Sequence, residues 1–130
     1  MKIIDAYLLD LISEQAKTSP RLRMNYNFHE TLDAKTQRLL NAMEPGTKLP
    51  IHRHQTTPET YIVLKGSLKV LLYSDNHELI STIEVDPKKG VFGVNLPAGQ
   101  WHTIEVLETG TVIFEVKDGP YQPISDKDIL

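Results

Sequence analysis

Four side chains of the types that bind transition metals lie in two short segments of the chain. His52 and His54 are separated by one residue, and Glu59 follows after a short turn. In an extended segment residues i and i+2 point to the same side, so the two imidazoles project together. A Pro-x-Gly turn at residues 97–99 would direct His102 toward them from a neighbouring strand. Three imidazoles and one carboxylate form a suitable ligand set for one divalent transition metal ion.

This ligand set does not select the metal, because iron, manganese, nickel and zinc all accept imidazole and carboxylate. A bound ion acts as a Lewis acid toward a carbonyl or hydroxyl group, lowers the pKa of bound water or, if it is iron, binds dioxygen. The chain contains five histidines and no cysteine. Thiolate metal sites, iron–sulfur clusters and cysteine nucleophiles are therefore excluded, and the predicted site uses nitrogen and oxygen ligands only.

Several other polar side chains are candidates for contacting a small ligand near such an ion. Residues 21–29 alternate strictly between polar and apolar, which is typical of a strand with one polar face. This face either is solvated or lines a cavity, in which case Arg23, Asn25 and Asn27 would bind a substrate. The arginines of this segment and Arg38 could hold a carboxylate or phosphate group in bidentate fashion, or equally be solvated charges.

His29 and Tyr61 are the candidates for moving a proton. If Glu59 faces inward as a ligand, strand alternation also turns Tyr61 inward. Tyr61 would then donate a hydrogen bond or proton to a ligand, or simply pack in the core. His29 ends the polar strand and would support a ligand or act as a general base, with a surface position as the alternative.

The elements that must position these residues are one helix and a series of short strands. Apolar residues at positions 4, 8, 11 and 12 share one face of a helix, which Thr18-Ser19-Pro20 ends. From residue 21 the period changes to two, and about eight short strands follow, separated by turns. This pattern predicts an all-β fold that closes as a barrel or jelly roll. We expect residues 1–20 to pack on the barrel or on a dimer partner, and residues 21–130 to form the barrel domain.

Length and charge limit the classes of partner. The 130 residues fit one domain, and the net charge of −3 offers no basic excess for binding nucleic acid. No apolar run approaches the roughly 20 residues that span a bilayer, and Asp5 and Asp10 interrupt the apolar N-terminus. We therefore expect a cytoplasmic protein that binds a small polar metabolite, with no nucleic-acid or membrane partner. Its sheet edges and N-terminal helix favour a homodimer.

Two sequence motifs resemble those of the cupin superfamily. The segment Gly46–Gly66 matches the first cupin motif, G-x5-H-x-H-x4-E-x6-G, at every defined position. The segment around Pro97 resembles the second motif, G-x5-P-x-G-x2-H-x3-N, although Gly90 lies one residue too far from Pro97 and Val106 replaces the final asparagine. The resemblance implies a single-domain cupin fold, which is a double-stranded β-helix or jelly-roll barrel. It also implies four metal ligands, which are His52, His54, Glu59 and His102.

From about Ser19 to Asp128 the sequence resembles the narrower family of WbuC-type cupin-fold metalloproteins. Members of this bacterial family often lie in gene clusters for surface polysaccharide or O-antigen synthesis, which implies a role in that metabolism. Six segments carry this resemblance: Arg21–Arg23, Asn25–His29, Gln37–Ala42, Pro45–Gly46, Gly99–Thr103 and Phe114–Tyr121.

Three functions are compatible with these residues. The first is a metal-dependent isomerase or epimerase acting on a sugar, sugar nucleotide or similar small polar metabolite, with His29 or Tyr61 moving a proton. The second is a non-catalytic metal-binding or small-ligand-binding module with a regulatory role. The third is an iron-dependent dioxygenase.

Overall fold

The chain begins with one amphipathic helix, α1, which spans Ala6–Thr18 in a computed structural model that describes all 130 residues. Asp5 caps it, because its side chain accepts a hydrogen bond from the Leu8 backbone N–H at 3.0 Å. The apolar face buries Ile12 and Ala16. No helical segment has the length and apolar character needed to cross a membrane.

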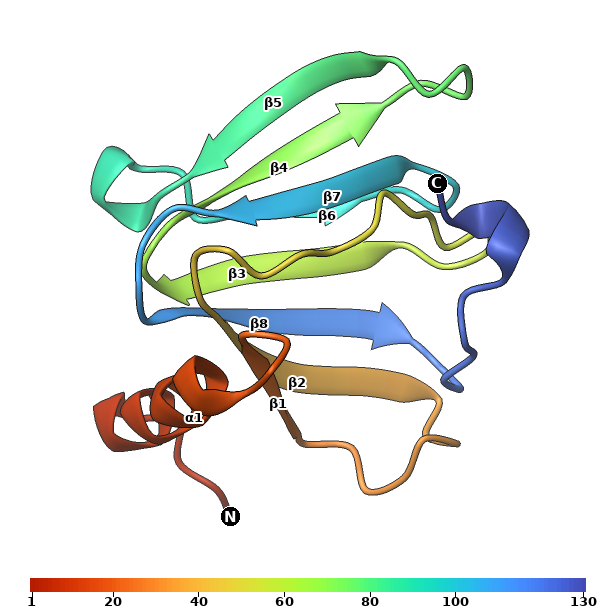
Figure 1. The fold of residues 1–130 in the computed structure, drawn as a ribbon. Helices are drawn as coiled ribbons and strands as arrows, with labels where there is room; N and C mark the ends of the chain where they lie inside the picture. The colour runs from red at the N-terminus through yellow and green to blue at the C-terminus, as the bar shows by residue number, and fades with distance from the viewer.

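Eight strands follow the helix and form two antiparallel sheets, which face each other in Figure 1. The larger sheet has the order β1-β2-β8-β3-β6, and the smaller sheet has the order β5-β4-β7. The strands are β1 (Arg23–Asn27), β2 (Thr36–Met43), β3 (Glu59–Lys65), β4 (Leu68–Tyr73), β5 (Leu79–Val85), β6 (Gly93–Leu96), β7 (Trp101–Val106) and β8 (Thr111–Asp118). Two 3₁₀ turns, η1 (Pro87–Lys89) and η2 (Asp126–Asp128), complete the structure.

The expected barrel is not closed. Every strand ladder pairs members of the same sheet, so β1 and β6 remain edges of the larger sheet and β5 remains an edge of the smaller one. β6 has only four residues and pairs with β3 alone, so it does not extend to the facing sheet. The molecule is therefore mostly β, with two facing sheets and one N-terminal helix.

Apolar side chains fill two separate layers. The main core lies between the sheets, where Tyr61, Val63 and Ile113 of the larger sheet pack with Leu68 and Val70 of β4. A second layer lies under α1 on the outer face of the larger sheet, as Figure 1 shows for the helix beside β1 and β2. Its buried members are Ile12, Ala16, Leu40, Ala42 and Val112. β2 is thus covered on both faces, so its inward residues point into the space between the sheets.

The strand predicted at residues 21–29 is shorter in the structure. β1 starts at Arg23 because Leu22 has a left-handed backbone with φ of 57°. Its apolar residues Met24 and Tyr26 pack beneath α1, as the alternation predicts. Its polar residues therefore face the space between the two sheets.

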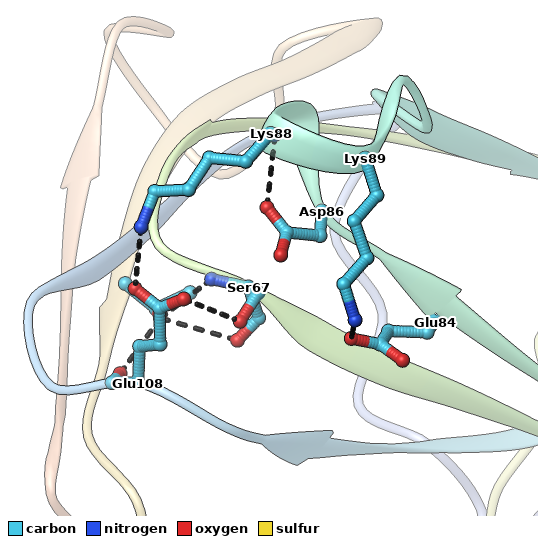
Figure 2. Close-up of polar contacts among 7 residues, drawn as sticks. Ser67, Glu84, Asp86, Lys88, Lys89 and Glu108 are labelled. Atoms are coloured by element: carbon cyan, nitrogen blue, oxygen red, sulfur yellow. Dashed lines mark hydrogen bonds and ion pairs between the residues drawn. The ribbon is translucent and has the colours of Figure 1, made fainter.

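Polar contacts link the connecting segments at the end of the molecule where β3 and β7 finish (Figure 2). The Ser67 hydroxyl donates to Glu108 Oε1 at 3.1 Å, and Lys88 Nζ lies 3.6 Å from Glu108 Oε2. The Lys88 backbone N–H donates to Asp86 Oδ1 at 2.9 Å. The β3–β4 and β7–β8 connections both pass between sheets near these contacts, so this end is tied together while the opposite end is free to hold a cavity.

Candidate metal centre

The segment that carries His52 and His54 is an extended loop held from both sides. The backbone N–H of His52 donates to the His102 carbonyl at 3.0 Å, and the reverse bond measures 2.9 Å. On the other side the Arg53 N–H donates to the carbonyl of Asp128 at 3.0 Å, and Arg53 Nε contacts the Asp128 carboxylate at 2.8 Å. The segment therefore extends the smaller sheet beyond β7 and fixes the histidines against His102.

Two of the histidines are oriented by backbone carbonyls in the same way. Nδ1 of His52 lies 2.8 Å from the Pro50 oxygen, and Nδ1 of His102 lies 2.8 Å from the Gln100 oxygen. Because a carbonyl oxygen only accepts hydrogen bonds, each Nδ1 carries a hydrogen. In the neutral ring Nε2 then has a free lone pair, which is the arrangement typical of metal-ligating histidine.

Glu59, the first residue of β3, is buried among these rings. Its Oε1 lies 2.9 Å from His54 Nε2, and its Oε2 lies 3.2 Å from His102 Nε2. The Tyr61 hydroxyl donates to Oε2 at 2.6 Å. Burial by itself raises the pKa of Glu59, but the close contacts with the His102 and His54 rings and the hydrogen bond from Tyr61 outweigh it and hold the pKa well below its usual range. Glu59 is therefore a carboxylate at neutral pH.

This donor set fits a cation. A lone pair on Nε2 of His102 repels the Glu59 carboxylate at 3.2 Å unless a proton or a metal ion lies between the two atoms. Ligand atoms bound at 2.0–2.2 Å to one ion are roughly 3–4 Å apart. One ligand atom each from His52, Glu59 and His102 falls within a mutual distance of 4.8 Å, so this cluster could bind a metal.

Burial prepares His52 for such a role. It lowers the pKa of His52 to about 4, with a further contribution from the neighbouring His102. The imidazole is therefore neutral at pH 7 and available as a ligand. The ring of His52 lies 4.4 Å from that of His102 and 5.2 Å from that of His54, measured between centroids. His54 contacts Glu59 but lies outside the tighter group of three.

The cluster opens into a cavity of about 340 Å³ between the sheets, a size within the range of small-molecule sites. His52, His54, Glu59 and Tyr61 line one part of it. The polar face of the β1 segment lines another, which brings the predicted residues Arg23, Asn25, Asn27 and His29 to the same cavity, together with Arg21.

Arg38 is the predicted ligand-binding residue that the structure does not bring there. It lies on β2 between Gln37 and Leu39, which both line the cavity, so strand alternation turns Arg38 to the opposite face. Its side chain is exposed on that outer face. The sequence could not show which alternating set of β2 residues faces inward, because the second half of this strand is buried on both faces and shows no polar–apolar alternation.

The two predicted proton carriers are both engaged in hydrogen bonds. The Tyr61 hydroxyl donates a hydrogen bond to Glu59. The pKa of Tyr61 is raised well above its usual value, mainly by burial and next by the charge of Glu59. The Arg38 backbone N–H donates to Nδ1 of His29 at 3.1 Å. The same Nδ1 lies 3.1 Å from the Arg38 carbonyl oxygen. Hydrogen bonds therefore hold both side chains in place at the cavity wall.

Glu115 of β8 is a cavity residue that the sequence analysis missed. It pairs directly with Tyr61 across the β3–β8 ladder, and its Oε1 accepts a hydrogen bond from Asn41 Nδ2 at 2.9 Å. Burial raises the pKa of Glu115 to about 7, although the Asn41 contact lowers it in part. Residues that face one another across an antiparallel ladder share a face of the sheet. The signal was therefore the inward parity of Tyr61, but using it requires knowing that β3 pairs with β8.

Replacing His102 with alanine tests the candidate metal centre. Because the variant loses one buried ligand, we expect its affinity for a divalent transition metal to fall at least about tenfold, measured by elemental analysis after loading and desalting. His77→Ala is the matched control, since His77 is exposed in the β4–β5 turn. Unchanged metal content in both His52→Ala and His102→Ala would show that the centre is elsewhere.

Replacing Glu115 with glutamine tests its buried environment in the metal-free protein. Between pH 4.5 and about 7 the folded chain holds a proton on Glu115 that the unfolded chain has released, so this group lowers the free energy of unfolding as pH rises. At pH 8.5 we expect the free energy of unfolding of Glu115→Gln, measured with urea, to be about 1–3 kcal/mol higher than that of the wild type. The gain should largely vanish at pH 4.5. An equal gain at both pH values, or the same pattern in the exposed-site control Glu105→Gln, would contradict this account.

Solved structures with a similar fold come from several organisms. The capsular polysaccharide assembling protein CapF from Staphylococcus aureus matches with a TM-score of 0.62 and 24% identity, over 76% of this chain and 27% of CapF. The Cnp3 cupin domain from Schizosaccharomyces pombe matches with a TM-score of 0.59 and 10% identity, over 74% of this chain and 64% of that one. A putative sugar phosphate isomerase from Acidithiobacillus ferrooxidans matches with a TM-score of 0.59 and 21% identity, over 75% of this chain and 59% of the isomerase. The chain thus spans about a quarter of CapF and less than two thirds of the other two.

These likenesses establish the fold, since they include a cupin domain and extend over most of the chain. Comparison with curated proteins gives no match. A family model described as a domain of unknown function, DUF6016, matches residues 4–85, which is more than half of the chain. The chain therefore belongs to the DUF6016 family, and its fold is that of the cupins.

Proposed function

We propose that this protein is a metal-dependent enzyme that isomerises or epimerises a sugar, sugar nucleotide or similar small polar metabolite in bacterial surface polysaccharide metabolism. One observation carries the proposal. The candidate metal centre, for which we propose His52, His54, Glu59 and His102 as ligands, adjoins a cavity that is lined by the first three of these and by the ionisable carboxyl group of Glu115. A metal ion that stabilises the developing negative charge and a carboxyl group of near-neutral pKa that moves the proton can together promote proton transfer next to a carbonyl.

A metal bound at the centre would supply Lewis acidity toward a carbonyl or hydroxyl oxygen of the ligand. Glu115 is the residue best placed to move the proton. It forms no ion pair, and a pKa of about 7 lets it hold or release a proton near neutral pH. Tyr61 instead donates a hydrogen bond to Glu59, and His29 accepts one from the Arg38 backbone, so we assign Tyr61 to holding Glu59 and His29 to contacting the ligand.

The polar wall of the cavity supports a sugar-like ligand. Asn25, Asn27 and Gln37 line it from β1 and β2, and Lys117 lines it from β8. Amide groups both donate and accept hydrogen bonds, as sugar hydroxyl groups do. The resemblance to WbuC-type proteins supports the place in surface polysaccharide metabolism. The likeness in fold to a capsular polysaccharide assembling protein and to a putative sugar phosphate isomerase gives further support.

Proton transfer can be tested without knowing the substrate. Metal-loaded protein is incubated in D₂O with a panel of sugars, sugar phosphates, uronic acids and sugar nucleotides, and deuterium incorporation at carbon is read by NMR. We expect exchange into at least one member. Glu115→Gln should lower the exchange rate at least about a hundredfold while it still binds the metal. Glu105→Gln, at an exposed position on β7, should exchange at the wild-type rate.

Each other result points to one of the two alternatives. Tight binding of a panel member without exchange would show a non-catalytic binding or regulatory module. Turnover that occurs only with iron and dioxygen would show a dioxygenase. Full exchange activity in Glu115→Gln would remove this residue from the proton transfer.

We also propose that the protein is a homodimer that works in the cytoplasm, where such metabolites are made. Ile62 and Leu64 of β3 are exposed on the outer face of the larger sheet, and Phe92 is exposed just before β6, the strand next to β3. Burying them against a second copy would remove apolar surface from water. Light scattering after size exclusion should give twice 14.8 kDa, and Phe92→Lys should shift the mass toward the monomer. A monomer in the wild type would contradict the proposal.

A further inference from the structure

Arg21 and Arg23 lie next to each other at the start of β1, and both line the cavity that holds the candidate metal centre. The backbone between them is fixed in an uncommon conformation. Leu22 has φ of 57°, which is sterically unfavourable for a leucine. The Glu44 backbone N–H donates to the Leu22 oxygen at 2.9 Å, and the Thr47 hydroxyl donates to the Arg21 oxygen at 2.7 Å. Such a backbone persists only where its surroundings enforce it, so the placement of the two arginines is built into the fold.

Neither guanidinium group has an anionic partner in the protein. The ion pairs of the chain involve other residues, and Arg53 is the arginine that pairs with a carboxylate. The side-chain contact of Arg23 is a long one, 3.5 Å from Nη1 to the Lys48 carbonyl oxygen. Burial lowers the pKa of Arg23, and the charge of Arg21 lowers it further. The charge of Glu115 raises the pKa of Arg23 in part, but neither of the two neighbouring arginines forms an ion pair with it or with another carboxylate.

The charge of the cavity also differs from that of the whole chain. The chain has a net charge of −3. The cavity, however, is lined by three cationic side chains, Arg21, Arg23 and Lys117, against the carboxyl groups of Glu59 and Glu115. A divalent ion at the candidate metal centre would make the cavity more positive still. A cavity of one sign attracts ligands of the other sign.

We propose that Arg21 and Arg23 form an oxyanion subsite, which binds the phosphate or carboxylate group of a sugar-derived metabolite whose other end reaches the candidate metal centre. Guanidinium groups hold both kinds of oxyanion through paired N–H donors. The inference deepens the proposed function, since it restricts the ligand to anionic sugars such as sugar phosphates, sugar nucleotides and sugar acids.

Binding measurements test the subsite separately from catalysis. Calorimetry on the protein with and without its metal uses four probes: inorganic phosphate, glucose 6-phosphate, glucuronate and glucose. We expect the metal-loaded wild type to bind the phosphate ester, the acid or both at least about tenfold more tightly than glucose. This preference should weaken in high salt. The ester and acid arms distinguish a phosphate from a carboxylate ligand, and the metal-free arm separates the arginines from direct metal binding.

Arg23→Gln should lower the affinity for the anionic probes at least about tenfold, so that their advantage over glucose disappears. Arg38→Gln should bind them as the wild type does. The two variants remove the same charge from neighbouring strands, but Arg38 lies on the exposed outer face of β2. Thermal unfolding and metal content confirm that both variants are folded and loaded. Arg21→Gln provides a second reading if Arg23→Gln does not fold.

Three results would overturn the inference: equal affinity for glucose and the anionic probes, no binding of any anionic probe, or equal weakening by Arg23→Gln and Arg38→Gln. The proposed function fails by a different result. Anionic probes that bind through Arg23 without deuterium exchange would refute the isomerase and leave the subsite. Exchange into neutral sugars alone would refute the subsite and leave the isomerase.

Discussion

The buried carboxylate of Glu59 determines how this end of the protein can be arranged. It is surrounded by His54, His102 and the Tyr61 hydroxyl, and no lysine or arginine pairs with it. A buried anion requires positive charge or hydrogen-bond donors close by. Since backbone carbonyls already fix the Nδ1 hydrogens of His52 and His102, the remaining position between the rings and the carboxylate suits a cation. The polarity of the surrounding cavity follows from this requirement.

The open, two-sheet form of the fold supplies the space for that arrangement. At one end, the connections around Ser67 and Glu108 tie the sheets together. At the other, the loop with His52 and the start of β7 meet β3, and the inward polar residues of β1, β2 and β8 prevent an apolar core from filling the gap. The main core therefore occupies the closed half of the sandwich. The helix covers the outer face, so stability and ligand contact are assigned to different layers.

Where the signals are local, the sequence predicts the series of short strands and the grouping of His52, Glu59 and His102. The spacing of His52, His54 and Glu59 and the turn before His102 are short-range patterns, and the eight strands of the structure match the predicted series of short strands separated by turns. The features that depend on which strands pair with one another could not be predicted from the sequence. Glu115 reaches the cavity only because β8 lies beside β3, and Arg38 leaves it because of the parity of β2. The open barrel likewise reflects which strand edges pair, and one chain's hydrophobic pattern does not specify that.

The contact between the C-terminal segment and the His52 loop has a consequence for how the protein is made. Arg53 is bonded to Asp128 through both backbone and side chain, and His52 forms a bridge with Ile129. During synthesis a chain folds from its N-terminus as it emerges. The helix and most strands can therefore assemble on the ribosome while this loop still lacks its outer support. A metal ion would meet a fully braced set of histidines only after residues 128–129 have been made and have docked against this loop, so metal capture would follow the assembly of the strands rather than guide it.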